Sequence, residues 1–435
     1  MTTKSLPSLS PKADSRLYET DSWLQEVYDG CITVLPAQPS TLRIDSSHSR
    51  LGNIDQLPPE LQLLIIEQLD FRSLSRLMRT SRKGKTIVEG LAAFIDMIEH
   101  APEVLTALGK TNIISHHSAA SLRQVLRSQK CASCFDFGPL LFLPTCERIC
   151  PTCVLYNDAF WMTTPSLAKE CFSLSDDQLG TIPIMRVIPG AYGFWEYHCN
   201  LGPINRLVSA KQVKQLGLEI HGSEEALALL KPAPPPFVDI SYIFTGDPVT
   251  STEEAEADSY FERCSRHDFI QRIHSMKLEP PGRRLSSAGA DYDSGDYFLG
   301  TAVCKFPSLS NSGPDFGYAC GSCWTFSEEF WKLPNWRQLI PDSLKEFSKN
   351  EVWHHYQNAS NVVHSEAEYS EHLEKCPGVP FQLAQLEKAD EKLRSENITA
   401  NDNYRDSEDG DDESTASGGS ESQESTSNDV SEEED

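Results

Sequence analysis

Cysteine is the residue type whose spacing in this sequence points most directly to chemistry. Five of the thirteen cysteines lie between positions 131 and 153, in CASCFDFGPLLFLPTCERICPTC. Cys131 and Cys134 form one C-x2-C pair, and Cys150 and Cys153 form a second after fifteen intervening residues. Each such turn presents two sulfurs, and two turns complete a tetrahedral four-thiolate zinc site. We therefore predict structural zinc at these four residues.

Two other uses of this cluster fit the sequence less well. A thioredoxin-like redox pair needs one C-x2-C at a helix start in a βαβ context, which the flanking segments do not provide. A RING ubiquitin ligase uses eight ligands, but no His lies between Cys146 and Cys150, and the C-x2-C pair that would complete the set is separated from Cys153 by 166 residues. Cys146 is expected to be a buried small side chain or a thiol beside the zinc site.

A second constellation combines Cys320 and Cys323 of YACGSCW with His372 and Cys376 of EYSEHLEKCPG. Residues four apart share one face of a helix, so His372 and Cys376 can bind one ion together with the C-x2-C turn. The intervening gap of 48 residues is tolerable, because closure costs only about 0.6 kcal/mol per doubling of loop length. A structural zinc contributes roughly 10 kcal/mol or more. We predict a second zinc site here, with His364 as the substitute ligand.

Neither predicted site is expected to be catalytic. Four protein ligands leave no open position for an activated water. The sequence contains no HExxH, no phosphate-binding glycine-rich loop and no GxSxG, so nothing assembles a nucleophile with its base. The histidine pairs of ISHHS (116–117) and VWHHY (354–355) are expected to be surface or packing residues. The chain is therefore predicted not to be an enzyme.

Composition limits the compartment and the partners. The N-terminal MTTKSLPSLSPKADS lacks the features of a signal peptide, and no apolar run approaches the length of a membrane span. We expect a soluble protein of the cytoplasm, the nucleus or both, where cysteines stay reduced. The formal net charge is −26, which argues against nucleic-acid binding. Half of that charge lies in residues 401–435, where fourteen acidic residues face one Arg; we predict a disordered tail.

Hydrophobic periodicity predicts short helices in IDQLPPELQLLIIEQLDFRSLSRLMRTSRKGKTIVEGLAAFIDMIEHA. Pro58 and Pro59 suit the start of the first helix, Ser73 is a candidate cap for the second, and Ser118 is a candidate cap for a later one. The predicted fold class is mainly α with small β elements. The expected organisation is a flexible N-terminal arm (1–50), a helical segment (51–100), a helical and four-cysteine zinc-knuckle region (101–230), a Pro-rich spacer with a partly disordered insertion (231–317), a CxxC/HxxxC zinc-binding segment (318–390) and a disordered acidic tail (391–435).

The segment LPPELQLLIIEQLDFRSLSRLMRTS resembles an F-box, which begins with Leu-Pro and continues through two leucine-bearing helices to a Ser/Arg stretch. The tryptophan that usually follows is absent here. The wider chain is similar to filamentous-fungal F-box proteins in which a cysteine-rich segment follows the F-box; KCASC, FGPLLFLPTCERICPTC, IPGAY and the later H-x3-C helix carry this likeness. The resemblance implies that the adaptor-binding residues are Leu57, Pro58, Leu61, Ile65, Leu69, Leu74 and Leu77.

The resemblance further implies a non-catalytic substrate receptor of a cullin-based SCF ubiquitin ligase, which binds a Skp-family adaptor and an unknown protein substrate. The candidate capture surface is the zinc-braced region with the aromatic C-terminal segment, although its tryptophans can equally be core: Trp324, Trp331, Trp336 and Trp353. One alternative is a zinc-stabilised interaction module outside any ligase. A zinc-dependent DNA-binding regulator is a third class, which the net charge and the lack of a basic cluster beside either C-x2-C disfavour.

Overall fold

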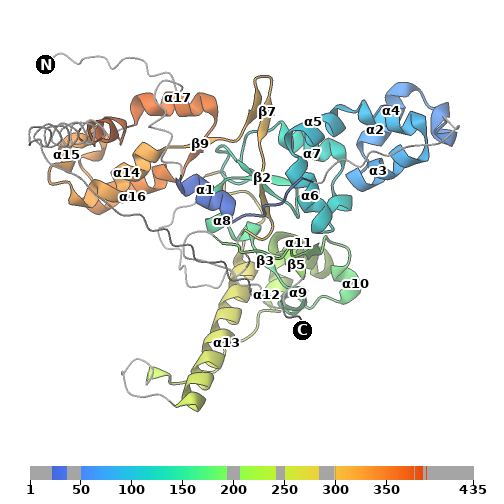
Figure 1. Ribbon diagram of the computed structural model, residues 1–435. Helices are drawn as coiled ribbons and strands as arrows, with labels where there is room; N and C mark the ends of the chain where they lie inside the picture. The colour runs from blue at the N-terminus through green and yellow to red at the C-terminus, as the bar shows by residue number, and fades with distance from the viewer. Residues whose placement is uncertain are drawn as a thin grey trace, which may run out of the picture. The chain divides into compact units, whose positions relative to one another are not determined.

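The computed structural model describes residues 22–36, 50–193, 206–241, 250–283, 298, 300–376, 378–385 and 388. The chain divides into one compact unit, Met1–Gln382, and a second, Leu383–Asp435. The acidic tail expected at 391–435 lies outside the described residues, and so do parts of the expected arm and insertion. Within the described part the fold is mainly helical with small antiparallel sheets (Figure 1), as the sequence predicts.

Short helices follow one another closely in the first part of the chain. Asp70, and not Ser73, caps the second of the predicted helices: its carboxylate accepts the Ser73 N–H at 2.9 Å. Ser118 caps its helix as expected, because its hydroxyl accepts the Ser121 N–H at 3.1 Å. The elements are η2 (Gly52–Gln56), α2 (Pro59–Glu67), α3 (Phe71–Thr80), α4 (Arg82–Glu89), α5 (Ala92–His100), α6 (Pro102–Lys110), η3 (Ile114–His116) and α7 (Ala119–Leu126).

A three-stranded antiparallel sheet in the order β2-β1-β6 carries the four-cysteine region. Strands β1 (Leu140–Phe142) and β2 (Glu147–Ile149) form a hairpin, and β6 (Val303–Lys305) pairs with the other edge of β1. The sequence assigned β6 to a partly disordered insertion. The strand is instead buried in the main core, because its apolar residues complete a sheet whose other strands lie far away in the chain. A small hairpin of β7 (Ser308–Ser310) and β8 (Gly313–Asp315) follows.

The described part of the expected N-terminal arm also belongs to this core. Helix α1 (Ser22–Asp29) and the residues after it bury Leu24, Val27 and Ile32. The Ile32 N–H donates to Val303 O of β6 at 2.8 Å. The Tyr28 hydroxyl donates to Phe316 O at 2.9 Å. Residues 22–36 are therefore not a flexible arm, because their apolar side chains have partners near residue 300 that local sequence does not reveal.

A second hydrophobic cluster forms around a sheet in the order β3-β5-β4 and the helices beside it. Helix α13 is the longest of these, and its C-terminal half packs into the cluster through Phe269, Ile270 and Ile273. Buried Lys214 donates to His274 O at 2.9 Å and so binds a carbonyl at the end of α13. The elements are α8 (Pro151–Tyr156), η4 (Asp158–Phe160), β3 (Met162–Thr163), α9 (Pro165–Phe172), α10 (Asp176–Leu179), β4 (Met185–Arg186), β5 (Arg206–Ser209), α11 (Ala210–His221), α12 (Glu224–Ala228) and α13 (Ser251–Ser275).

The C-terminal segment has an aromatic core of its own. Phe326, Phe330 and Tyr356 meet there edge to face or at a tilt, with ring centroids 4.9–6.1 Å apart. Helices α14 and α16 lie side by side (Figure 1), and the strand pair β9-β10 joins the segment's two ends. The elements are β9 (Tyr318–Ala319), α14 (Gly321–Glu329), η6 (Phe330–Lys332), α15 (Trp336–Leu339), η7 (Asp342–Leu344), α16 (Lys349–Ser360), β10 (Val363–His364) and α17 (Glu366–Lys375).

Candidate metal centres and docking face

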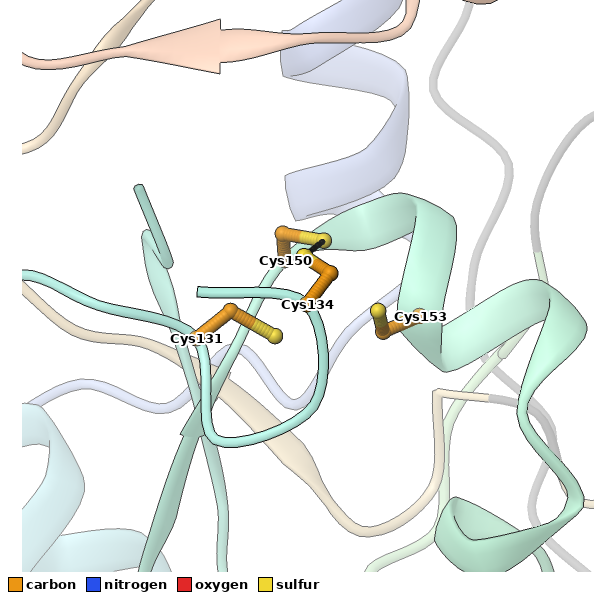
Figure 2. A group of neighbouring side chains, drawn as sticks. All are labelled: Cys131, Cys134, Cys150 and Cys153. Atoms are coloured by element: carbon orange, nitrogen blue, oxygen red, sulfur yellow. Dashed lines mark hydrogen bonds between the residues drawn. The ribbon is translucent and has the colours of Figure 1, made fainter. Parts of the chain in front are cut away.

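The first cysteine cluster brings four sulfurs into one buried site. The Sγ atoms of Cys131, Cys134, Cys150 and Cys153 all lie within 4.8 Å of one another. Figure 2 shows the first two on a loop and Cys153 on helix α8, with their sulfurs directed into a common space. The Cys134 and Cys150 sulfurs are 3.6 Å apart, close to the edge of about 3.8 Å of a tetrahedron with Zn–S bonds of about 2.3 Å. The arrangement fits one tetrahedral ion.

Local backbone hydrogen bonds shape the two turns that hold these sulfurs. In the first turn, the Phe135 N–H donates to Cys131 O at 3.1 Å, and Phe135 has a positive φ of 67°. In the second, the Cys153 N–H donates to Cys150 O at 3.1 Å as helix α8 begins. The turns are linked across the hairpin, because the Ala132 N–H donates to the carbonyl of Arg148 at 2.7 Å. The sulfurs are therefore positioned by the fold.

The proton balance of this cluster also suits a cation. Hydrogen bonds from Cys134, Cys150 and Cys153 lower the pKa of Cys131 far below its usual range. The hydrogen bonds to Cys131 raise the pKa values of Cys134 and Cys150, because these thiols donate them, and burial raises both values further. These shifts favour the thiolate at Cys131 and the protonated thiol at Cys134 and Cys150. A divalent ion would displace the remaining protons, so its affinity must rise with pH.

The second cluster joins a helix start to a helix end. Cys320 and Cys323 lie at the start of α14, and His372 and Cys376 lie on and just after α17, with all four ligand atoms within 4.8 Å of one another. The Cys323 sulfur is 3.4 Å from His372 Nε2 and 3.3 Å from the Cys376 sulfur. Hydrogen bonds from Cys320 and Cys323 lower the pKa of Cys376 to about 4. This donor set also fits one tetrahedral zinc.

The long gap between these ligands is closed by paired elements. Helices α14 and α16 run beside each other, and β10 then pairs with β9 so that Val363 lies opposite Ala319. This register returns the chain to the C-x2-C turn before α17 begins. His364, the proposed substitute ligand, is outside the cluster of four; its ring stacks on that of His372, with centroids 4.6 Å apart.

The remaining cysteine of the opening motif lies apart from the metal cluster. Cys146 is buried at the β1–β2 turn with a φ of 54°, and burial raises its pKa to about 12. A protonated, apolar thiol fits the packing role expected for it. Across the described residues, neither histidine pair joins a metal cluster; His117 instead contacts Leu143 O through Nε2 at 2.6 Å.

Helix α2 turns an apolar stripe away from the protein. Leu61, Leu64 and Ile65 are 46%, 59% and 47% exposed, whereas Gln62 and Ile66 are buried on the opposite side. The Gln62 amide satisfies its burial by donating to Leu57 O at 2.7 Å. Such an outward apolar row on a surface helix marks an interaction site. The apolar residues Leu61, Leu64 and Ile65 of the sequence's i, i+3, i+4 pattern thus lie on an exposed face of α2 and not on a core face.

The other residues predicted for adaptor binding divide into two groups. Leu57 and Pro58 begin the motif at half-buried and exposed positions, so they can extend the α2 stripe. Leu69 and Leu77 pack against the main core, and Leu74 is fully buried. A side chain with no exposed surface cannot present a docking face, so the assignment of Leu74 to adaptor contact is corrected to internal support of the helices. Leu63, which the prediction does not include, is 44% exposed.

Three of the four tryptophans proposed for substrate capture are largely structural. Trp336 is buried in the C-terminal aromatic core, and Trp324 packs against the main core. The Trp353 indole donates to Ser327 O at 3.2 Å. Trp331 alone among the four is classed as exposed, at 49%. The aromatic richness of this segment therefore mostly reflects its own core.

Comparison with known protein families finds one match within the chain. The model of the F-box domain matches residues 54–91, inside the segment 51–100 expected from the sequence. These residues run from η2 through α4 and include the exposed stripe of α2. No curated protein and no solved structure is significantly similar to the chain.

Proposed function

We propose, from the premise that this chain carries an F-box domain at residues 54–91, that it is a substrate receptor of a cullin-based SCF ubiquitin ligase. F-box domains typically bind a Skp-family adaptor within such complexes. The observation that carries the proposal is the outward row of Leu61, Leu64 and Ile65 on α2. Fully burying a leucine or isoleucine side chain is worth about 1.5–3 kcal/mol, so this row alone can supply several kcal/mol to adaptor binding.

The receptor itself is proposed to perform no covalent step. It holds a target lysine near the ubiquitin-charged enzyme that the cullin's RING partner brings, and so raises the effective concentration of the two reactants. Both cysteine clusters support this role, because four protein ligands each leave no position for a reacting water. The twelve described cysteines are all free thiols, which favours the cytoplasm or nucleus as the site of action.

We propose that both clusters bind structural zinc. When bound, zinc supplies a fixed tetrahedral cross-link between its four ligands. In the first cluster, the cysteines join the loop after α7 to the start of α8; in the second, they join the start of α14 to the end of α17. The residues at both sites are buried or partly buried, so the ions brace the surface that presents the substrate and do not contact it.

Co-purification with a purified Skp-family adaptor tests the proposal. Replacing Leu61 and Ile65 by Asp should abolish capture of the adaptor, because each carboxylate would be desolvated in an apolar interface. Leu229→Asp is the matched control, since Leu229 is 87% exposed and lies outside the F-box. Equal capture by the double variant and the control would reject the ligase assignment and leave a zinc-stabilised interaction module.

A further inference from the structure

A half-open groove lies between helices α9 and α13, in a part of the chain that no comparison assigns. Its volume is about 410 Å³, within the range of roughly 300–1,000 Å³ that is typical of ligand pockets. Leu167 from α9, Phe261 and Phe269 from α13, and Phe298 supply its apolar lining, and Asp258 and Glu262 supply acidic groups. The groove is too small for a folded element but can take a large side chain with its flanking backbone.

The floor of the groove is fixed before any ligand arrives. The Phe269 ring stacks on Trp161 with centroids 5.4 Å apart and planes 9° from parallel. The Arg272 guanidinium lies over the other ring of this pair, 4.1 Å from the Trp161 centroid, and bonds Asp158 at 3.1 Å. Because these groups are already ordered, binding costs little rotamer entropy at the floor.

The upper wall is apolar at its centre and acidic beside it. Phe261 is 43% exposed, which leaves much of a large ring open to solvent. Asp258 and Glu262 are four residues apart and so share the face of α13 that borders the groove. Neither carboxylate forms an ion pair with another described residue, and both are exposed. The apolar centre is therefore flanked by two negative charges that are available to a partner.

The one cationic group in the lining, Arg266, offsets only part of this charge. Arg266 is held by Glu170 of α9 through two hydrogen bonds, one of them from Nε at 3.3 Å. Glu170 is the main cause of the raised pKa of Arg266, and Glu262 makes a smaller electrostatic contribution. The half of α13 that leads to the groove, residues 251–262, contains five acidic residues and no basic one. The charged groups of the lining are thus two carboxylates and one guanidinium that Glu170 already binds. This excess of negative charge favours cationic partners.

We propose that this groove binds an extended peptide segment of the substrate in which a large apolar side chain is flanked by Arg or Lys. The apolar residue enters between Leu167 and Phe261 onto Phe269, and its basic neighbours pair with Asp258 and Glu262. This inference rests on the proposed receptor function, because it identifies the class of substrate. It uses residues that are separate from the F-box, so the two can fail independently.

Fluorescence anisotropy with two labelled peptides tests the proposal on the full chain in complex with its adaptor. One probe carries a central Leu between paired arginines, and the other carries glutamates in place of the arginines. We expect the basic probe to bind, with affinity that falls as salt rises, and the acidic probe not to bind. The double variant Asp258→Lys and Glu262→Lys should weaken the basic probe on the order of tenfold, and Phe261→Ala about fivefold or more.

The double variant Glu254→Lys and Glu256→Lys is the matched control, because it reverses the same charge on the same helix outside the groove lining. The proposal is overturned if this control weakens the basic probe as much as the groove variant does, since attraction would then be non-specific. Equal binding of both probes also overturns it. If the basic probe binds only after residues 284–297 are deleted, the groove binds a segment of this chain and the proposal of a substrate peptide is overturned. Adaptor capture, measured in parallel, reports on the F-box alone.

Discussion

Replacing Arg148 by Met should strongly destabilise the four-cysteine region. Arg148 lies on β2 and is 2% exposed, and none of the described carboxylates forms a hydrogen bond or ion pair with it. The five N–H groups of its guanidinium make six contacts of 2.5–3.4 Å with five main-chain carbonyls, so one N–H of Nη2 is shared between two of them. Two of these carbonyls end helix α7, one precedes β1, and two follow β6. The carbonyls belong to Val125, Leu126, Gly138, Phe306 and Pro307.

The expected magnitude follows from two opposing effects. Hydrogen bonds to charged groups contribute at least about 1.5 kcal/mol each, so the five N–H groups of the guanidinium together contribute about 8 kcal/mol. Burial opposes them by lowering the pKa of Arg148 from 12.5 to about 9, which at 1.36 kcal/mol per pKa unit is a cost of about 5 kcal/mol. The difference, about 3 kcal/mol, is the expected loss of unfolding free energy in the Met variant.

Urea denaturation followed by far-UV circular dichroism measures this loss. With a slope of about 1–3 kcal/mol per molar urea, the midpoint should fall by more than about 1 M. Arg127→Met is the matched control: its side chain is 41% exposed and pairs with Asp96 at 3.0 Å, so it should cost less than about 1 kcal/mol. If the Arg148 and Arg127 variants unfold at the same urea concentration, the carbonyl network does not stabilise the fold and the reasoning is wrong.

Three further predictions concern the metal sites, the backbone and pH. Cys150→Ser should remove one zinc per chain, with a loss on the order of 10 kcal/mol of binding free energy. Cys146→Ser, which also replaces a buried cysteine, should keep both ions; elemental analysis measures the zinc content of each variant. Equal zinc loss in the two variants would show that the ligands are assigned wrongly. Gly317→Ala should lower the melting temperature by the equivalent of about 1–3 kcal/mol. The φ of Gly317 is +80°, and a Cβ at this residue would lie 2.6 Å from atoms of Phe137 and Val363. Gly109→Ala is the control and should not lower the melting temperature, because a Cβ at Gly109 would meet no atom within 4 Å. Burial lowers the pKa of His117 below its ordinary 6.5, so the unfolded state binds the proton more tightly than the folded state. The free energy of unfolding should therefore fall as the pH drops below about 6.5. In acid titrations, His117→Gln should make the free energy of unfolding depend less steeply on pH.

The sequence predicts the metal clusters well because their information is local. A C-x2-C turn places two sulfurs together whatever the rest of the chain does, and the H-x3-C spacing does the same on one face of α17. The F-box is predictable for a similar reason, since its helices follow one another directly. The orientation of α2 is less local. The sequence shows an apolar stripe, but only the fold shows that Gln62 and Ile66 face inward and that the stripe is exposed.

The remaining parts of the fold depend on contacts that no local pattern reveals. Residues 22–36 follow a polar, Ser- and Pro-rich stretch and yet pair with Val303, 271 positions away from Ile32. Arg148 stands in the charged-looking stretch CERIC, and its burial depends on carbonyls contributed by three distant segments. A charged residue is almost never fully buried unless it is paired, so a sequence reading assigns it to the surface. The groove beside α13 was missed for the same reason, since α9 lies about ninety positions earlier.

Folding and binding use different residues in this protein, and this separation gives the proposed tests their power. The proposed cysteine ligands and Arg148 are buried and His372 is half-buried, so their loss must act mainly through stability. The α2 stripe and the groove residues Phe261, Asp258 and Glu262 are exposed, so their replacement removes little free energy of folding. A variant at one of these exposed residues that loses its partner while it keeps its melting temperature therefore identifies a contact. A variant at one of the buried residues that loses its partner shows only that the fold has been destabilised.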